Sequence, residues 1–392
     1  METIKDKVAI IGMGCSKFGE NWDKSADDMI IDAVYEAYED AGVERQDIQA
    51  AWVGTAFSGI GGISIASPLK LDRIPITRLE NFCATGMETL RNASYAIAAG
   101  VYDVVLCVGF EKLKDTGLTG LPAGYTHPVL GINVTAPGRW AMGATRYFQA
   151  YGIAPQEGRE TLARISVKSH YNGARHPKAH LRREVTIEQV LNAPLIAWPL
   201  GLLDCCGNTD GAAAAILTRA DMAKSFRDDY VLVKGIGLAI GPGLGKEDAD
   251  YDYLHLPETE AAAQQAYEQA GITNPRKELD ILELHDCFTI SELMTLEAIG
   301  ICPKGKAKED IDAGTFTLTG ELPVNADGGL KSFGHPIGAS GLRECYEVYK
   351  QIQGKAELPE RQLKDVRLGL SHNQGGHPGS LLPIITILGQ AG

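Results

Sequence analysis

The sequence has no long apolar run. No segment approaches the roughly 18 consecutive apolar residues that a membrane-spanning helix requires. The opening residues, METIKDKVAII, carry charges and have no long apolar stretch before a cleavage site, as a secretory signal would. These features predict a cytoplasmic protein that has no membrane partner.

Positive charge is scarce. The chain has 37 Lys and Arg residues against 50 Asp and Glu residues, which gives a formal net charge of −13. Nucleic acids and anionic membranes attract basic surfaces, so the composition argues against nucleic acid as a partner. An anionic ligand would need a local basic patch, and one candidate lies between Arg159 and Arg183. A solvated loop face explains the same composition equally well.

Cysteine pairs with zinc-ribbon spacing are also missing. The eight cysteines do not form a Cys-x-x-Cys motif, and without a secretory signal disulfides are not expected. Cys205 and Cys206 are adjacent, but neighbouring cysteines bridge poorly, so we interpret them as buried thiols rather than as a metal or redox pair. The sequence therefore predicts no metal site, and a reactive cysteine must be identified from its surroundings.

Short apolar runs alternate with helical patterns along the chain, which is typical of an α/β fold with a largely parallel sheet. A length of 392 residues allows two halves with separate cores, and we place them at 1–225 and 226–392. From about 114 to 208 the alternation loosens into Gly, Pro, His and Arg with shorter helical pieces. This stretch predicts an inserted loop domain, and long insertions often carry substrate.

The two halves repeat each other most clearly at two tetrapeptides, Asn-Phe-Cys-Ala at 81–84 and His-Asp-Cys-Phe at 285–288. Each follows a predicted strand, and each precedes a predicted helix that starts with Thr-x-x-Glu, at 85–88 and 289–292. That spacing predicts a capping box at both helix N-termini. Strand ends that lead into helices are where chemistry collects in α/β sheets.

Cys83 lies at one of these helix N-termini. Unpaired backbone N–H groups and the positive end of the helix dipole are expected to lower the pKa of its thiol and to favour the nucleophilic thiolate. On residue type alone a small buried hydrophobe is favoured by roughly three to one. The polar and glycine neighbours of Cys83 reduce these odds, because they indicate a tight turn rather than a core position.

Two glycine-rich segments hold further candidates. His335 lies within GGLKSFGHPIGASG, where the backbone must turn sharply or approach something closely, and a histidine held this way suits a base. Taken alone, a loop histidine is more often a surface residue. Ser-His-Asn-Gln-Gly-Gly-His-Pro-Gly at 371–379 follows a predicted strand, and its glycine N–H groups could form an oxyanion hole.

These four segments, in this order over nearly the whole chain, resemble the thiolase superfamily. The resemblance is closest to the branch of sterol-carrier-protein-type thiolases and archaeal or bacterial acetyl-CoA acetyltransferases, in which His-Asp-Cys-Phe replaces Asn-Glu-Ala-Phe. Val-Gly-Phe-Glu-Lys at 108–112 and His-Asn-x-Gly at 372–375 also look like this branch. The resemblance implies a five-layered αβαβα fold of two similar βαβαβαββ halves with an inserted loop domain.

The resemblance also implies roles for individual residues. Cys83 is the nucleophile that becomes acylated, and His335 accepts its proton. Cys287 is the second acid/base, in place of the cysteine that other thiolases have at the position of Asn373. Thiolase chemistry by way of an acyl-Cys83 intermediate would form or cleave a 3-oxoacyl-CoA.

Two oxyanion holes are implied as well. His285 and His335 would hold the enolate-like thioester oxygen, and the backbone N–H groups of Cys83 and Gly375 would hold the tetrahedral oxyanion. The basic residues assigned to coenzyme A are Arg175, Lys178, Arg182 and Arg183. His377 and Pro378, where smaller residues are expected, leave the acyl specificity open.

Coenzyme A thioesters are the implied substrates, with no tightly bound cofactor. Acetoacetyl-CoA is the default, and branched, dicarboxylic or aryl 3-oxoacyl-CoA of the benzoylsuccinyl-CoA type are alternatives. The family implies a homodimer or homotetramer. Thiolases of this branch are often paired with a small zinc-ribbon and OB-fold protein of the DUF35 type.

Other functions remain open from the sequence. A nicotinamide dehydrogenase is disfavoured, because Gly12-x-Gly14 is followed by its third glycine only at Gly19. Thiolase-fold retro-aldolases acting on CoA esters dispense with the acylated cysteine, and a condensing enzyme would leave Cys287 without a role. A noncatalytic subunit that binds acyl-CoA and a DUF35-type partner is the alternative from another class.

Overall fold

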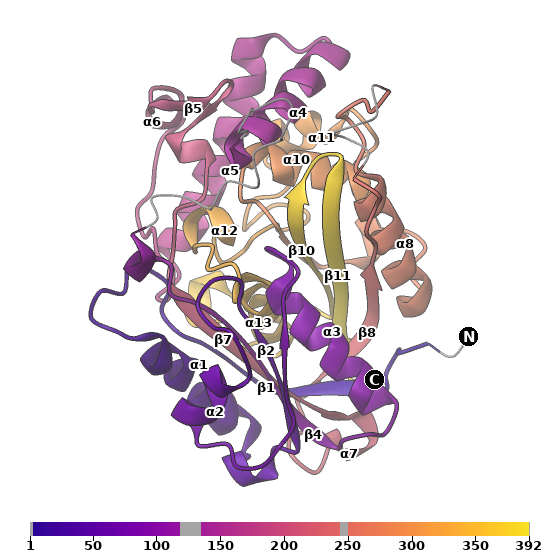
Figure 1. The fold of residues 1–392 in the computed structure, drawn as a ribbon. Coiled ribbons are helices and arrows are strands. Elements are labelled where there is room, and N and C mark those ends of the chain that lie inside the picture. Colours follow the sequence, from indigo (N-terminus) through magenta and orange to yellow (C-terminus); the bar gives the residue numbers. More distant parts are fainter. Residues whose placement is uncertain (1–2, 118–134, 244–249, 392) are drawn as a thin grey trace.

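The computed structural model describes residues 3–117, 135–243 and 250–391 (Figure 1). Within these ranges, no helix combines the length and the apolar character needed to span a membrane. Residues 118–134, which belong to the predicted loop domain, lie outside the described part of the chain.

The first half contributes five strands of the main sheet: β1 (Val8–Cys15), β2 (Ala50–Gly54), β3 (Ile76–Leu79), β4 (Val104–Glu111) and β7 (Gly211–Arg219). They lie in the order β3-β2-β4-β7-β1, with β2 parallel to β3 and β4 and with β7 antiparallel to its neighbours. Along β7, Ala213 and Leu217 face one hydrophobic core while Ala212 and Ile216 face another. This burial on both faces explains the continuous apolar run of the strand.

The second half contributes four strands: β8 (Val231–Leu238), β9 (Ile281–Leu284), β10 (Leu368–His377) and β11 (Ser380–Gln390). β10 is parallel to β9 and antiparallel to β11, and β11 is antiparallel to β8. Ala9 pairs with Leu232 and Ile10 with Val231. This short pairing of β1 with β8 joins the two sets of strands into one nine-stranded sheet.

Helices pack on the strands in three layers (Figure 1). α3 (Thr85–Ala98) and α13 (Ser340–Ile352) pack against each other and against strands of both halves, so they form the central layer. α1 (Ala26–Ala41) covers the outer face of the first half, and α8 (Pro257–Ala270) covers that of the second. With the strands of each half between them, these helices complete the five-layered α/β architecture predicted from the sequence.

Close packing explains the glycine-rich run that precedes α13. A Cβ atom at Gly338 would lie 2.6 Å from the carbonyl oxygens of Gly54 and Phe110, and one at Gly109 would lie 2.0 Å from the carbonyl oxygen of Gly338. Contacts this short exclude a side chain, so the backbone passes directly over the ends of β2 and β4. His335 is thereby held on a rigid support.

The segment between β4 and β7 forms α4 (Ala136–Ala150), α5 (Pro155–Ala174), α6 (Ile187–Leu191) and the hairpin of β5 (Leu195–Ala197) and β6 (Leu200–Gly201). The other helices are α2 (Ile63–Leu69), α7 (Ala220–Ala223), α9 (Pro275–Glu278), α10 (Thr289–Ala298), α11 (Ala307–Ala313) and α12 (Gly329–Ser332). α5 packs against α10, α11 and α12. The inserted segment therefore rests on the second half of the chain.

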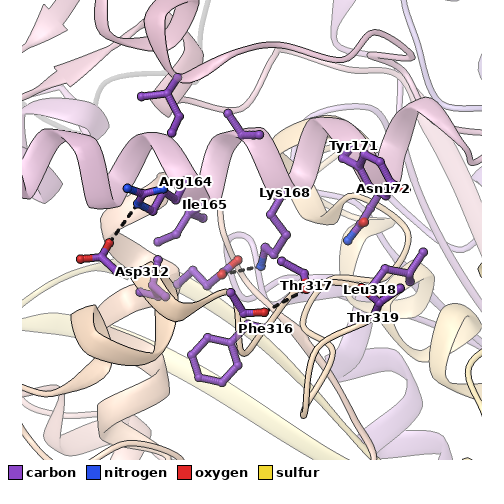
Figure 2. Close-up of a pocket in the computed structure, with 15 residues that line it drawn as sticks. Arg164, Ile165, Lys168, Tyr171, Asn172, Asp312, Phe316, Thr317, Leu318 and Thr319 are labelled. Carbon is purple, nitrogen blue, oxygen red and sulfur yellow. Dashed lines mark hydrogen bonds and ion pairs between the residues drawn. The ribbon is translucent and has the colours of Figure 1, made fainter.

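A buried ion pair between Lys168 and Glu292 joins α5 to α10. The two side chains are 6% and 0% exposed, and Asn325 donates a further hydrogen bond of 2.9 Å to Glu292. The pair lies at a cavity of about 390 Å³ between α5 and residues 314–319 (Figure 2). No predicted catalytic residue lines this cavity, so we assign the ion pair a structural role.

Replacing Lys168 by methionine should lower the free energy of unfolding by about 3–5 kcal/mol, because the buried Glu292 carboxylate loses its partner. Chemical denaturation measures the loss, and the double variant Lys168→Met/Glu292→Gln should recover part of it. Lys306 pairs with Glu309 at 56% and 68% exposure and serves as the control. Lys306→Ala should cost less than about 1 kcal/mol, and an equal loss in both single variants would contradict the structural role.

Candidate active site

The turn that carries Cys83 is held by Thr85. The hydroxyl of Thr85 accepts a hydrogen bond of 2.8 Å from the Asn81 N–H and donates one of 2.5 Å to the Phe82 carbonyl oxygen. Phe82 adopts a φ of +48°, an unfavourable conformation for a bulky residue, so the turn is strained. The predicted capping box is wrong here, because Ala84 is the N-cap residue and Thr85 holds the turn instead.

The second predicted capping box is also wrong. Phe288 is the N-cap residue of α10 and makes no side-chain cap. The Thr289 hydroxyl donates to Asp204 at 3.0 Å, and Glu292 is paired with Lys168. Both side chains are committed to long-range tertiary contacts, which override the local capping pattern.

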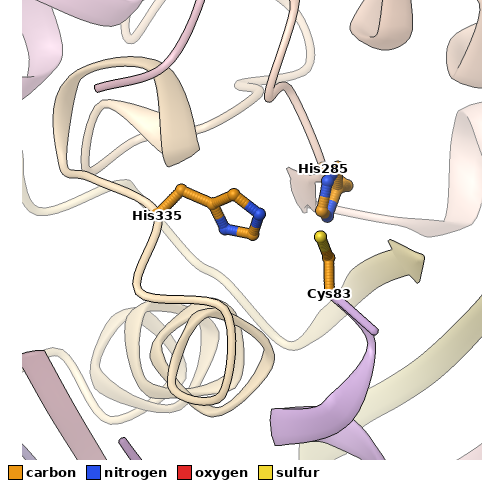
Figure 3. Close-up of side chains that lie close together, drawn as sticks. All are labelled: Cys83, His285 and His335. Carbon is orange, nitrogen blue, oxygen red and sulfur yellow. The ribbon is translucent and has the colours of Figure 1, made fainter. Parts of the chain in front are cut away.

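Cys83, His285 and His335 meet at the centre of the molecule, although they lie far apart in the sequence (Figure 3). The Cys83 Sγ atom and one ring nitrogen of each histidine all lie within 4.8 Å of one another. The two imidazole rings are 5.1 Å apart between centroids and nearly perpendicular, at 85°. Three of the residues predicted from separate motifs are therefore gathered in one cluster.

Hydrogen bonds assign the proton of the His335 ring. The Ser340 hydroxyl donates to the Pro336 carbonyl oxygen at 3.0 Å and lies 2.7 Å from His335 Nδ1. With its own proton on the Pro336 carbonyl oxygen, the hydroxyl accepts from Nδ1–H, which leaves a lone pair on Nε2. Nε2 is buried and has no hydrogen-bond partner among the described residues. His335 is thus poised to accept a proton from the neighbouring thiol of Cys83.

Burial sets the charge states of the cluster. It lowers the pKa of His335 to about 3, with a smaller contribution from the Arg343 charge, and lowers the pKa of His285 well below its usual value. Burial, then the charges of Glu111 and Glu80, raise the pKa of the Cys83 thiol to about 12. The expectation of a lowered Cys83 pKa is therefore wrong, because desolvation outweighs the helix N-terminus. The resting site is a neutral thiol beside neutral imidazoles.

Cys287 is buried near the cluster and has a second cysteine, Cys206, as a neighbour that no sequence motif marks. The carbonyl oxygen of Cys287 accepts a hydrogen bond of 2.8 Å from the Cys206 N–H, and Cys205 forms a β-bridge with Phe288. Burial, then the nearby Cys206 and Cys83, raise the pKa of Cys287 well above its ordinary value. Cys206 belongs to the site, whereas its sequence context suggested only a buried thiol.

Gly375 packs against the Cys83 turn. A Cβ atom at this position would lie 2.7 Å from Phe82 Cβ and 3.3 Å from the Cys83 nitrogen. Only glycine lets the end of β10 come this close, and the Gly375 and Cys83 backbones consequently run side by side. This approach supports the predicted oxyanion hole of their two N–H groups.

Two of the four basic residues assigned to coenzyme A have protein partners. Lys178 pairs with Glu36 at 2.6 Å, and Arg175 pairs with Glu184 at 2.8 Å and stacks on Tyr171. Arg182 and Arg183 are exposed. Their contact with coenzyme A stays a prediction.

Two groups in the described part of the chain have side chains of metal-ligand type. The first is the catalytic cluster, and the second is His176, Glu347 and Glu357. In the second group Arg361 donates to Glu347 at 2.6 Å and to Glu357 at 2.9 Å. The arginine already neutralises these carboxylates, so this group is better explained as a buried ion-pair network.

Ser340 is expected to affect kcat rather than substrate binding. Ser340→Ala removes the acceptor that orients His335, so we expect a fall in kcat of about 10- to 100-fold with little change in KM. Steady-state kinetics and thermal unfolding of the variant test this. A raised KM at unchanged kcat would contradict the orienting role.

Comparison with known families decides the identity of the fold. Residues 8–221 match the model of the thiolase N-terminal domain, and residues 248–388 match a thiolase C-terminal domain-like model. The chain belongs to the thiolase family. The family and the fold predicted from the sequence are therefore confirmed.

The relatives cover nearly the whole length of this thiolase. An acetyl-CoA acetyltransferase of Methanothermobacter thermautotrophicus is 39% identical over 95% of the chain and 97% of its own length. One of Methanocaldococcus jannaschii is 36% identical with the same coverage. Human sterol carrier protein 2 is 30% identical over 94% of this chain and 70% of its own. The prediction of a thiolase-type acyltransferase of this branch is confirmed.

Two solved structures frame the comparison. The Ltp2-ChsH2(DUF35) aldolase matches with a TM-score of 0.85 and 27% identity, over 99% of each chain. Human mitochondrial 3-ketoacyl-CoA thiolase matches with a TM-score of 0.69 and 18% identity over the full length of both chains, which shows a shared fold.

Proposed function

We propose that this thiolase cleaves or forms a 3-oxoacyl-CoA by Claisen chemistry through an acyl-Cys83 intermediate, with acetoacetyl-CoA as the default substrate. One observation carries the proposal: the unpartnered His335 Nε2 lies in the same buried cluster as the Cys83 thiol. A neutral thiol next to an open imidazole nitrogen can transfer its proton at the moment of attack.

Each residue of the cluster has a step in cleavage. His335 takes the Cys83 proton, and the sulfur attacks the 3-oxo carbon, whose oxygen receives hydrogen bonds from the Cys83 and Gly375 N–H groups. The bond between C2 and C3 then breaks. His285 and the protonated His335 hold the enolate oxygen of the departing acetyl-CoA, while Cys287 gives its proton to C2. A second CoA thiol gives its proton to the Cys287 thiolate and takes the acyl group from Cys83, whose sulfur recovers its proton from His335.

A substrate panel tests this function. Acetoacetyl-CoA and branched, dicarboxylic and aryl 3-oxoacyl-CoA compounds are incubated with CoA, and the acyl-CoA products are separated by chromatography. We expect CoA-dependent cleavage of at least one compound. Absence of cleavage throughout the panel, in the presence of any partner protein, would overturn the proposal.

Aldol cleavage is the second candidate, because the 27% identical solved structure is an aldolase. The same panel extended to 3-hydroxyacyl-CoA compounds discriminates the two reactions. Aldol cleavage needs neither CoA nor an acylated cysteine, so it would survive replacement of Cys83. Thiolytic cleavage would not.

A DUF35-type partner and a homodimer are part of the proposal. The aldolase structure includes a DUF35 chain, which supports a partner of this kind. Co-expression of the chain with a DUF35-type protein followed by size-exclusion chromatography with light scattering tests both points. A monomer that never co-elutes with such a protein would contradict them.

A further inference from the structure

Asn373 lies in a closely packed position beside the catalytic cluster. It lies on β10, is fully buried, and its Nδ2 group is 3.1 Å from His285 Nδ1. On the other side, a Cβ atom at Gly341 would lie 2.5 Å from Asn373 Oδ1, so only glycine in α13 leaves room for this amide. The amide is therefore placed between α13 and His285.

Two N–H donors converge on His285 Nδ1. One is the Asn373 amide, and the other is the Gln374 backbone N–H at 3.3 Å. A ring nitrogen that receives two donors must present its lone pair, so the ring proton is on Nε2. The backbone donor cannot be reversed, which also fixes the orientation of the Asn373 amide.

The two catalytic histidines thus carry their protons on opposite nitrogens. His335 donates through Nδ1 to Ser340 and presents a bare Nε2, whereas His285 accepts at Nδ1 and presents Nε2–H. One ring can accept a proton and the other can donate a hydrogen bond. This division suits a reaction that needs a base for a thiol and a donor for an oxyanion.

Glu344 supports the Asn373 amide from the next turn of α13. Its Oε1 atom lies 3.4 Å from Asn373 Nδ2, the residue is fully buried, and Oε2 has no partner among the described residues. Burial raises the pKa of Glu344 well above its usual value. The Arg343 guanidinium, 4.0 Å from Glu344 Oε1, opposes this rise, and Oε1 accepts the second proton of the amide.

We propose that Asn373, anchored by Glu344, is a positioning residue that fixes the Nε2–H tautomer of His285 and so makes His285 a hydrogen-bond donor to the enolate oxygen. The assignment of the His285 tautomer rests on geometry alone. Its effect on the enolate rests on the proposed thiolase reaction.

Asn373→Leu tests the proposal with a side chain of similar size that cannot donate. Exchange of the C2 protons of acetyl-CoA with deuterium from solvent, followed by NMR, reports enolate formation. Acylation of Cys83 by acetyl-CoA, followed by intact mass, does not need the enolate. We expect exchange and kcat to fall about 10- to 100-fold, with acylation and KM nearly unchanged.

Substitutions at Glu344 and Ser371 are the controls. Glu344→Gln keeps an acceptor oxygen for the Asn373 amide and should retain exchange, whereas Glu344→Leu removes it and should lower exchange. Ser371 is also buried on β10 and, two residues before Asn373, lies on the same face. Among the described residues its hydroxyl makes no hydrogen bond to His285, and Ser371→Ala should leave exchange unchanged. Equal losses in Glu344→Gln and Glu344→Leu would overturn the anchoring role.

The tautomer of His285 can be determined without an activity measurement. Nitrogen NMR of the chain labelled at histidine, with His285→Gln for assignment, should show an unprotonated Nδ1 and a protonated Nε2 at His285. The reverse assignment overturns the proposal, as does Asn373→Leu with unchanged exchange or with an equal loss of acylation. If the unsubstituted chain forms no acyl adduct, the proposed function fails, and the NMR result still decides the tautomer.

Discussion

Replacing Cys83 by alanine is expected to lower the rate of 3-oxoacyl-CoA cleavage by about 10⁴-fold or more, because no other group can form the acyl intermediate. The histidines of the cluster are neutral, and Cys287 is assigned to proton transfer, so neither replaces the nucleophile. Steady-state cleavage of the best substrate of the panel measures the loss.

Cys302→Ala is the matched control, because it removes a buried free thiol that contacts Asp310 and is not part of the catalytic cluster. Its rate should stay close to that of the unsubstituted chain. Cleavage that persists in Cys83→Ala would rule out the acyl-enzyme route and favour aldol chemistry.

Replacing His335 by asparagine is expected to make Cys83 acylation depend on pH. In the unsubstituted chain the imidazole, with a pKa of about 3, is an open base over the whole neutral range, and the thiol, with a pKa of about 12, keeps its proton. Transfer between them is internal, so acylation should be flat between about pH 5 and 9. Without His335 the thiolate must form by loss of a proton to solvent, and its fraction rises tenfold for each pH unit below the thiol pKa.

The loss at neutral pH should be about 10²–10⁴-fold and should shrink as the pH rises. Rapid mixing with acetyl-CoA followed by intact mass measures acylation alone, apart from the later steps. A flat profile in His335→Asn would show that another group removes the proton. A rising profile in the unsubstituted chain would show that the resting thiol is not paired with an open base.

The fold can be predicted from the sequence because the patterns that indicate it are local. The apolar run of β7 reports burial on both faces, and the glycines around His335 report a backbone that packs directly on Gly54 and Phe110. Such signals need no knowledge of the partner segment. The same holds for the motifs of Cys83 and His285, which family resemblance places in one site.

Properties that depend on distant segments of the chain cannot be predicted from local sequence patterns. Local reasoning predicts a lowered Cys83 pKa, but burial by other parts of the chain reverses the direction. Thr289 and Glu292 have capping-box spacing, yet the Thr289 hydroxyl bonds to Asp204 and Glu292 pairs with Lys168. Glu344 belongs to no sequence motif, and only its position beside Asn373 in the structure links it to the site.

The central claim is that Cys83 becomes acylated, and intact mass tests it most directly. The chain and Cys83→Ser are mixed with acetyl-CoA or acetoacetyl-CoA, with and without a DUF35-type partner. The account predicts an added mass of one acetyl group on the unsubstituted chain, located at Cys83 by peptide mapping and absent from the variant. No adduct under any of these conditions, or an equal adduct on the variant, would contradict it.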